Sequence, residues 1–179
     1  MIRPRAALQG DGVRLRVVTL ADDPVLEAIF TDPEVTPWWP RSSSDDAETM
    51  LADDDICPFL IERRVEEEAG PEGWEPVGFL QTYEEAEPDY RHAGIDLALA
   101  GHAQGQGYGT EAVRIALDWL SGELGHHRVV IDPRADNERA IHTYSKVGFH
   151  PVGVLRHYER QPDGSWADGL LMEWLRPVS

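Results

Sequence analysis

A glycine-rich stretch at residues 101–110, GHAQGQGYGT, has the residue types to bind a phosphate group. It follows the alternating run GIDLALA and leads into TEAVRIALDWL, whose apolar residues recur at helical spacing, so we expect strand, glycine loop and helix. Gly105, Gly107 and Gly109 lack a Cβ, so the backbone can turn sharply and several N–H groups can converge on one anion at the positive end of the helix dipole. The stretch predicts a phosphate-binding loop, with a plain strand-to-helix turn as the alternative.

The pattern of this loop is not that of two common phosphate-binding motifs. A dinucleotide-binding loop needs G-x-G-x-x-G, and an ATP-binding loop needs Lys-Ser/Thr after its last glycine. Instead, Gln104-x-x-Gly107-x-Gly109 resembles the pyrophosphate-binding loop of the GNAT superfamily of N-acetyltransferases. The resemblance implies acetyl-CoA (coenzyme A) as the cofactor, with contacts from Leu97, Ala98, Leu99, Gln104, Gly105, Gln106, Gly107, Tyr108, Gly109 and Thr110.

A second motif follows a short apolar strand at residues 128–131. Asn137 can cap a helix that ends at Gly148, and its apolar stripe includes Ala140 and Tyr144. Asn137 and Tyr144 are seven residues apart, so they share a face roughly 10 Å from each other. The series Asn-x-x-Ala-x-x-x-Tyr-x-x-x-Gly-Phe also resembles the GNAT enzymes. It implies that Asn137 and Ala140 contact the cofactor and that Tyr144 protonates the departing thiolate, although a core aromatic is the alternative for Tyr144.

Acetyl transfer to an amine also needs a group that takes a proton, because an alkylammonium with a pKa of about 10 is largely protonated at pH 7. Asp96 is the first candidate, since its strand face is otherwise lined by the small Ala98 and Ala100. Gly94-Ile95-Asp96 matches the aminoglycoside 6'-N-acetyltransferases, which implies that Asp96 contacts the substrate amine. A solvent-facing carboxylate is the alternative. In the family, the two central strands splay and expose backbone N–H groups, here at residues 97–100, which would stabilise an oxyanion.

Aromatic and acidic residues elsewhere predict the acceptor side of the cleft. Asp132 ends a strand in Asp-Pro and is a second candidate base, or else a turn residue. Pro-Trp-Trp, which includes Trp38 and Trp39, also resembles the aminoglycoside enzymes, and we expect one tryptophan to pack on the core and the other to line the cleft. Glu84 would extend an acidic wall, or is simply part of an acidic loop. The predicted substrate-binding set is Trp38, Trp39, Tyr83, Glu84, Asp96 and Asp132.

Length and composition restrict the class of protein. A chain of 179 residues suits one domain, here a single GNAT domain over 1–179 in which residues 1–12 are expected to be irregular. The lone Cys57 cannot form an internal disulfide, and no apolar run resembles a membrane span or a signal peptide, so we expect a cytoplasmic protein. No metal site is expected, because His126 and His127 have no paired ligands at useful spacing.

The formal net charge of −17 would repel nucleic acid and anionic lipid, and we expect neither as a partner. It favours a cationic small molecule, although solubility or adaptation to salt would also explain it. The chain is expected to be a monomer or a homodimer.

The fold that these elements predict is α/β, with a mixed, mostly antiparallel central sheet flanked by helices and, as the resemblance implies, a splayed central strand pair. A turn at residues 161–164 joins the last two strands. The expected strands are residues 13–19, 57–63, 76–83, 94–100, 128–131, 151–160 and 165–175, and the expected helices are residues 21–30, a segment from near Ser44, residues 110–120 and residues 137–147.

Three functions remain open. The first is acetylation of the 6'-amine of an aminoglycoside by direct transfer. The second is acetylation of a protein N-terminus, a polyamine or a lysine-like siderophore precursor, because the C-terminal hairpin (151–175) resembles the ribosomal-protein N-terminal acetyltransferases. The third is a non-catalytic acyl-CoA-binding module.

Overall fold

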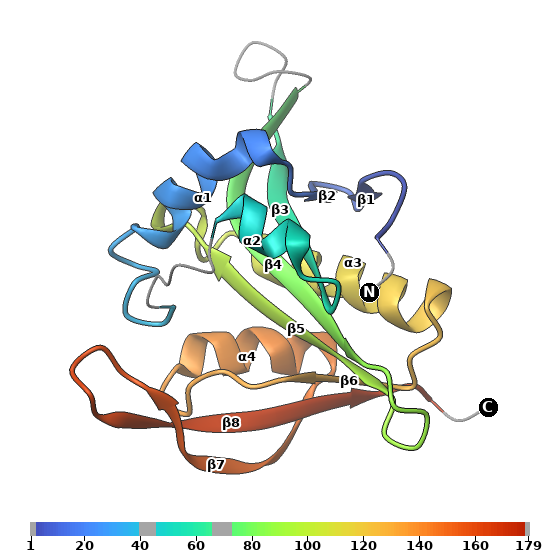
Figure 1. Cartoon of the computed structure of the whole chain (residues 1–179), viewed down its shortest axis with the longest axis vertical. Coiled ribbons are helices and arrows are strands. Elements are labelled where there is room, and N and C mark those ends of the chain that lie inside the picture. Colours follow the sequence, from blue (N-terminus) through green and yellow to red (C-terminus); the bar gives the residue numbers. More distant parts are fainter. Residues whose placement is uncertain (1–2, 40–45, 66–72, 178–179) are drawn as a thin grey trace.

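The described residues of the computed structural model are 3–39, 46–65 and 73–177, and they form one mixed sheet with helices on both faces (Figure 1). The strand order is β1-β2-β3-β4-β5-β6-β8-β7, and every neighbouring pair is antiparallel except β5 and β6. The predicted mixed, mostly antiparallel sheet is therefore confirmed. Its strands are β1 (Leu8–Gln9), β2 (Val13–Val17), β3 (Ile56–Arg64), β4 (Trp74–Glu85), β5 (His92–Leu99), β6 (Arg128–Ile131), β7 (His150–Arg160) and β8 (Trp166–Leu175).

The central strands β5 and β6 separate after a very short contact. They pair only at Ala93–Val129 and Gly94–Val130, after which β5 continues beside β4 while β6 continues beside β8. Figure 1 shows the two strands diverging from this point. The splayed central pair is thus present, and it leaves one edge of β5 without a neighbouring strand.

Two helices cover each face of the sheet. On one face, α3 (Tyr108–Asp118) and α4 (Glu138–Val147) pack on a core that includes Leu80 and Ile95. On the other, α1 (Asp23–Phe30) and α2 (Ala47–Ala52) pack on a core that includes Phe79 and Ala98. Because successive side chains of a strand point to opposite faces, β4 and β5 contribute alternate residues to the two cores.

The boundaries of α4 follow from its terminal residues. The Asn137 side chain caps the helix, with its Oδ1 accepting from the Ala140 N–H at 3.1 Å. Gly148 ends the helix with a φ of 104°, a conformation that glycine adopts with little strain. Both predicted ends of this helix are confirmed.

Three local expectations were wrong. Leu8 and Gln9 pair with β2, so residues 1–12 are not irregular throughout. The predicted cap Ser44 lies outside the described residues, and the cap of α2 is Asp46, whose Oδ1 accepts from the Thr49 N–H at 2.8 Å. The strand expected at residues 76–83 begins earlier, at Trp74, where the Arg14 guanidinium lies 4.7 Å from the Trp74 ring centroid. That contact is made across the sheet and leaves no local signal.

No helix among the described residues has both the length and the apolar character that crossing a bilayer requires.

Replacing Gly148 with alanine should lower the free energy of unfolding by about 1 to 2 kcal/mol, because an alanine at positive φ is strained. The added Cβ would lie 3.5 Å from Trp174 Cδ1, an ordinary contact, so the cost is one of backbone conformation. Urea denaturation measures it. Gly122→Ala is the control, because nothing lies within 4 Å of its added Cβ. Equal stability of the two variants would contradict this account.

Candidate active site

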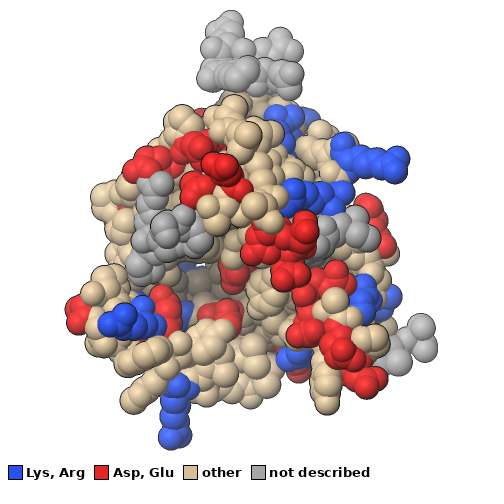
Figure 2. All heavy atoms as spheres, viewed as in Figure 1, with Lys and Arg blue, Asp and Glu red and all other residues tan. Residues whose placement is uncertain are grey.

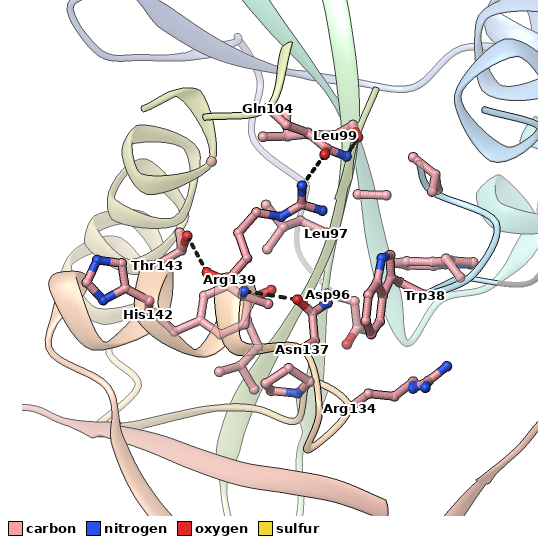
Figure 3. Close-up of a pocket in the computed structure, with 18 of the residues that line it drawn as sticks. Trp38, Asp96, Leu97, Leu99, Gln104, Arg134, Asn137, Arg139, His142 and Thr143 are labelled. Atoms are coloured by element: carbon pink, nitrogen blue, oxygen red, sulfur yellow. Dashed lines mark hydrogen bonds between the residues drawn. The ribbon is translucent and has the colours of Figure 1, made fainter. Parts of the chain in front are cut away.

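A cavity of about 600 Å³ occupies the space where β5 and β6 separate (Figure 3). The glycine loop and α4 line one side of it, and the loop after α1 and the end of β6 line the other. Figure 2 shows this face of the molecule hollowed between the loop after α1 and the β7–β8 hairpin, with acidic side chains around the hollow. The structure brings these predicted site residues to the cavity: Trp38, Trp39, Asp96, Leu97, Ala98, Leu99, Gln104, Gly105, Gly107, Gly109, Thr110, Asp132, Asn137, Ala140 and Tyr144.

The glycine loop has the open backbone that an anion site needs. Gly105 and Gly107 have φ values of 74° and 90°, and a Cβ built on either would meet nothing within 4 Å. Gly107 is the N-cap of α3, and Glu111 N–H is the first to bond within the helix, at 3.1 Å to Gly107 O. The first N–H groups of a helix have no intrahelical partner and carry the positive end of its dipole. A phosphate or diphosphate therefore fits this loop.

Two side chains hold the loop beside β5. The Gln104 amide donates from Nε2 to Leu99 O at 2.8 Å, and its Oε1 accepts from Arg139 Nη1. Gly109 allows α3 to approach β5, because a Cβ there would lie 3.1 Å from Leu99 Cδ1. The loop is thus fixed in position by the exposed edge of β5 and by α4.

Gln106 and Tyr108 do not line this cavity, although the loop motif includes them. The Gln106 side chain donates from Nε2 to His102 O at 2.7 Å, and Tyr108 packs against the core under α3. Their side chains line an adjoining surface pocket beside Leu8 and Arg114, which shares Gly107 and Thr110 with the cavity.

The backbone N–H and C=O groups of β5 point alternately toward β4 and away from it. Ala100 N–H donates to Val77 O, while Leu99 O accepts from Gln104. Backbone groups of a strand point alternately to its two sides, so the N–H and C=O of Leu97 and Leu99 point toward the gap between β5 and β6, and those of Ala98 point toward β4. The N–H groups that could polarise a carbonyl are therefore those of Leu97 and Leu99. Ala98 lines the cavity with its small side chain instead.

Asp96 lies on the α1 side of β5 and faces the cavity. Burial raises the pKa of its carboxyl to about 6. A hydrogen bond from Gln81 Nε2 to Oδ2, at 3.0 Å, opposes this shift, and the nearby charge of Asp132 adds to it. The carboxylate would therefore be largely ionised at pH 7 and still basic enough to accept a proton.

Tyr144 is buried on α4, with its ring packed edge-on against Phe149 at a centroid distance of 6.3 Å. Burial raises the pKa of its phenol, and the charges of Asp96 and Asp132 raise it further. The phenol is therefore protonated at neutral pH, as a proton donor at this position must be.

Both tryptophans line the cavity, but their packing differs. Trp39 packs on the core, with its ring centroid 5.4 Å from Phe30 and 5.7 Å from Phe79. Trp38 lies at the edge of the cavity, where the Arg134 guanidinium sits 4.9 Å from its ring centroid. Figure 3 shows Trp38 and Arg134 together, on the other side of the cavity from His142 and Thr143.

Tyr83 and Glu84 are outside the cavity. The Tyr83 ring crosses Gly94, where any Cβ would collide with it, and burial raises the pKa of its phenol. Glu84 is the next residue of the strand, so its side chain points to the opposite face and pairs with Arg91 at 3.3 Å. Glu84 therefore does not extend the acidic lining of this cavity.

Other charged and polar residues complete the acceptor side. Tyr158 donates from its hydroxyl to Asp132 Oδ2, and this bond is the main cause of the raised pKa of the Tyr158 phenol. Tyr158 lies in an irregular part of β7, between Leu155 and Glu159, where strand alternation gives no guide. The cavity residues that the sequence did not single out for the site include Glu34, Arg134, Tyr158 and Glu159.

Comparison with known proteins agrees with this geometry. Residues 13–150 match the family described as "Acetyltransferase (GNAT) domain". An aminoglycoside N(6')-acetyltransferase type 1 of Klebsiella pneumoniae is 31% identical over 169 residues, which cover 86% of this chain and 80% of that protein.

Two solved structures resemble the chain along most of its length. Aminoglycoside acetyltransferase AAC(6')-Ib in complex with coenzyme A and kanamycin is 26% identical, with a TM-score of 0.69 over 92% of this chain and 95% of that one. Ribosomal-protein-S5-alanine acetyltransferase from Vibrio fischeri is 18% identical, with a TM-score of 0.77 over 95% of this chain and 96% of that one, and shares the fold alone. Because residues 13–150 match the family model and the Klebsiella pneumoniae relative aligns over 86% of this chain, the chain belongs to the acetyltransferase (GNAT) domain family.

Proposed function

We propose that this protein transfers the acetyl group of acetyl-CoA to a primary amine of a cationic small molecule, with the 6'-amine of an aminoglycoside as the first candidate. The observation that carries the proposal is the position of Asp96, whose carboxylate faces the cavity between Leu97 and Leu99 on one side and Trp38 on the other. Relatives that bind coenzyme A and kanamycin support both substrates. The whole of 1–179 would act as one catalytic domain.

The cofactor side fits coenzyme A on the chain's own geometry. The open glycine loop at Gly105 and Gly107 would hold the pyrophosphate through backbone N–H groups. Asn137 uses Oδ1 to cap α4, so its side-chain NH2 is the group left to meet the pantetheine arm. Bound acetyl-CoA supplies an acetyl group activated as a thioester. This use of the backbone explains how a strongly acidic protein can bind an anionic cofactor.

Four residues carry the proposed transfer. Asp96 takes a proton from the acceptor ammonium and leaves a neutral, nucleophilic amine. The N–H groups of Leu97 and Leu99 face the gap and can stabilise negative charge on the acetyl oxygen as the amine adds. Tyr144 holds its proton at Oη and donates it to the departing sulfur, and its phenolate then takes up the proton that the acetylated nitrogen loses.

The acceptor side suits a cation that carries rings. Glu34, Asp96, Asp132 and Glu159 place carboxylates around the cavity, and Trp38 offers an aromatic surface. These groups would also accept a polyamine. Release of thiol from acetyl-CoA in the presence of kanamycin, spermidine, lysine or an N-terminal alanyl peptide decides between the acceptors. Turnover with the peptide only would reject the aminoglycoside, and coenzyme binding without any turnover would favour an acyl-CoA-binding module.

Asp96→Asn should lower kcat/KM about 10²-fold, because the variant keeps the shape but loses the base. In the wild type, the carboxylate is present above pH 6 and lost as the pH falls through about 6, so kcat/KM should fall on the acid side of this value. The pH profile of kcat/KM measures both effects. Asp118→Asn, an exposed carboxylate of α3, is the control. An unchanged acid limb in Asp96→Asn would exclude Asp96 as the base.

Tyr144→Phe should lower kcat about 10²-fold and leave the Kd of coenzyme A nearly unchanged, because only the hydroxyl that donates the proton is removed. Stopped-flow thiol release and calorimetric coenzyme titration give the two values. Full activity of this variant would assign Tyr144 a packing role against Phe149 only.

A further inference from the structure

Arg134 joins three segments that surround the acceptor side of the cavity. It lies in the connection between β6 and α4, and its Nη1 donates both to Pro37 O at 3.0 Å and to Gln161 Oε1 at 3.1 Å. Pro37 belongs to the loop after α1, and Gln161 begins the β7–β8 turn. One guanidinium therefore connects elements that are far apart in the sequence.

The orientation of this guanidinium is fixed by two further contacts. Asp136 binds it through both carboxylate oxygens, at 3.1 Å from Nε and 2.7 Å from Nη2. Its Cζ lies over the Trp38 ring, at 4.9 Å from the ring centroid. A two-pronged contact with one carboxylate is specific to arginine, because lysine has a single ammonium group.

The acceptor side has two walls, the loop after α1 and the β7–β8 hairpin. Each wall also has contacts of its own that hold it in place. The loop after α1 is held by Trp39 in the core and by Asp32, whose Oδ2 accepts from the Gly101 N–H at 2.8 Å. The hairpin wall is held by the bond from Tyr158 to Asp132 at the end of β6. Arg134 spans from one wall to the other, so it acts on their separation.

We propose that Arg134 is a positioning residue that sets the separation of the two walls of the acceptor side. With this separation fixed, Trp38 on one wall and Asp132 on the other can contact a single acceptor at the same time. Arg134 exchanges no proton and covers only one face of Trp38, so it affects acceptor binding more than the chemical step. Its effect on turnover rests on the proposed function.

Steady-state kinetics with the acceptor that the wild type uses test this role. In Arg134→Ala the KM of the acceptor should rise about tenfold, while kcat and the KM of acetyl-CoA should each stay within about twofold. In Arg134→Lys, the rise in the logarithm of the acceptor KM should be more than half of the rise in Arg134→Ala. Lysine keeps the positive charge but lacks the several N–H donors of the guanidinium. Arg176→Ala, an exposed arginine beyond the opposite end of β8, makes the same charge change and should have no effect. An unchanged acceptor KM, or an equal rise in both KM values, would overturn the proposal.

A second measurement needs no acceptor. The fluorescence of Trp38 is obtained by subtracting the emission of a Trp38→Phe protein from that of the matching protein with Trp38. Its quenching by acrylamide is then compared between the wild-type and Arg134→Ala backgrounds. The quenching constant should rise about twofold when the guanidinium no longer covers the ring, and an unchanged constant would count against Arg134 as the residue that holds Trp38. If the wild type acetylates none of the amines, the proposed function fails, while the quenching result still decides whether Arg134 holds Trp38.

Discussion

Two residue pairs hold β5 and β6 together, and the cavity exists because their pairing stops there. Beyond Gly94 the peptide groups of β5 that point away from β4 have no strand to bond, and a side chain, Gln104, takes up Leu99 O. A longer parallel ladder would satisfy those groups and fill the site. Asp96 lines this cavity, and burial of its carboxyl raises the pKa to about 6.

The parts of the fold that depend on neighbouring residues were predicted well. β6 was expected at residues 128–131, and α4 was expected to start from Asn137 and end at Gly148, because capping residues and periodicity are local signals. The start of α2 was missed, since the run Ser-Ser-Asp-Asp offers several good caps. Trp74 was missed for another reason: its place in β4 depends on arginines of two other strands, Arg14 and Arg64.

In the candidate site, too, local motifs could be read from the sequence, whereas contacts between distant segments could not. Its predicted cofactor side comes from two continuous motifs, and most of those residues line the cavity, whereas Gln106 and Tyr108 line the pocket beside it. The acceptor side comes from short segments brought together by folding. Arg134 looks like any surface arginine in the sequence, and Tyr158 sits where β7 loses its regular register. Tyr83 and Glu84 were both expected in the substrate-binding set, and neither lines the cavity.

The β7–β8 hairpin adds a consequence for how such enzymes diversify. The family match ends at residue 150, whereas Tyr158, Glu159 and Gln161 of the acceptor side all come later in the chain. The predicted cofactor side thus lies wholly before the hairpin, whereas the predicted acceptor side draws on both the family match and the hairpin. A descendant could exchange or remodel this terminal hairpin and acquire a different amine as substrate, while the inherited apparatus for the activated acetyl group stays intact.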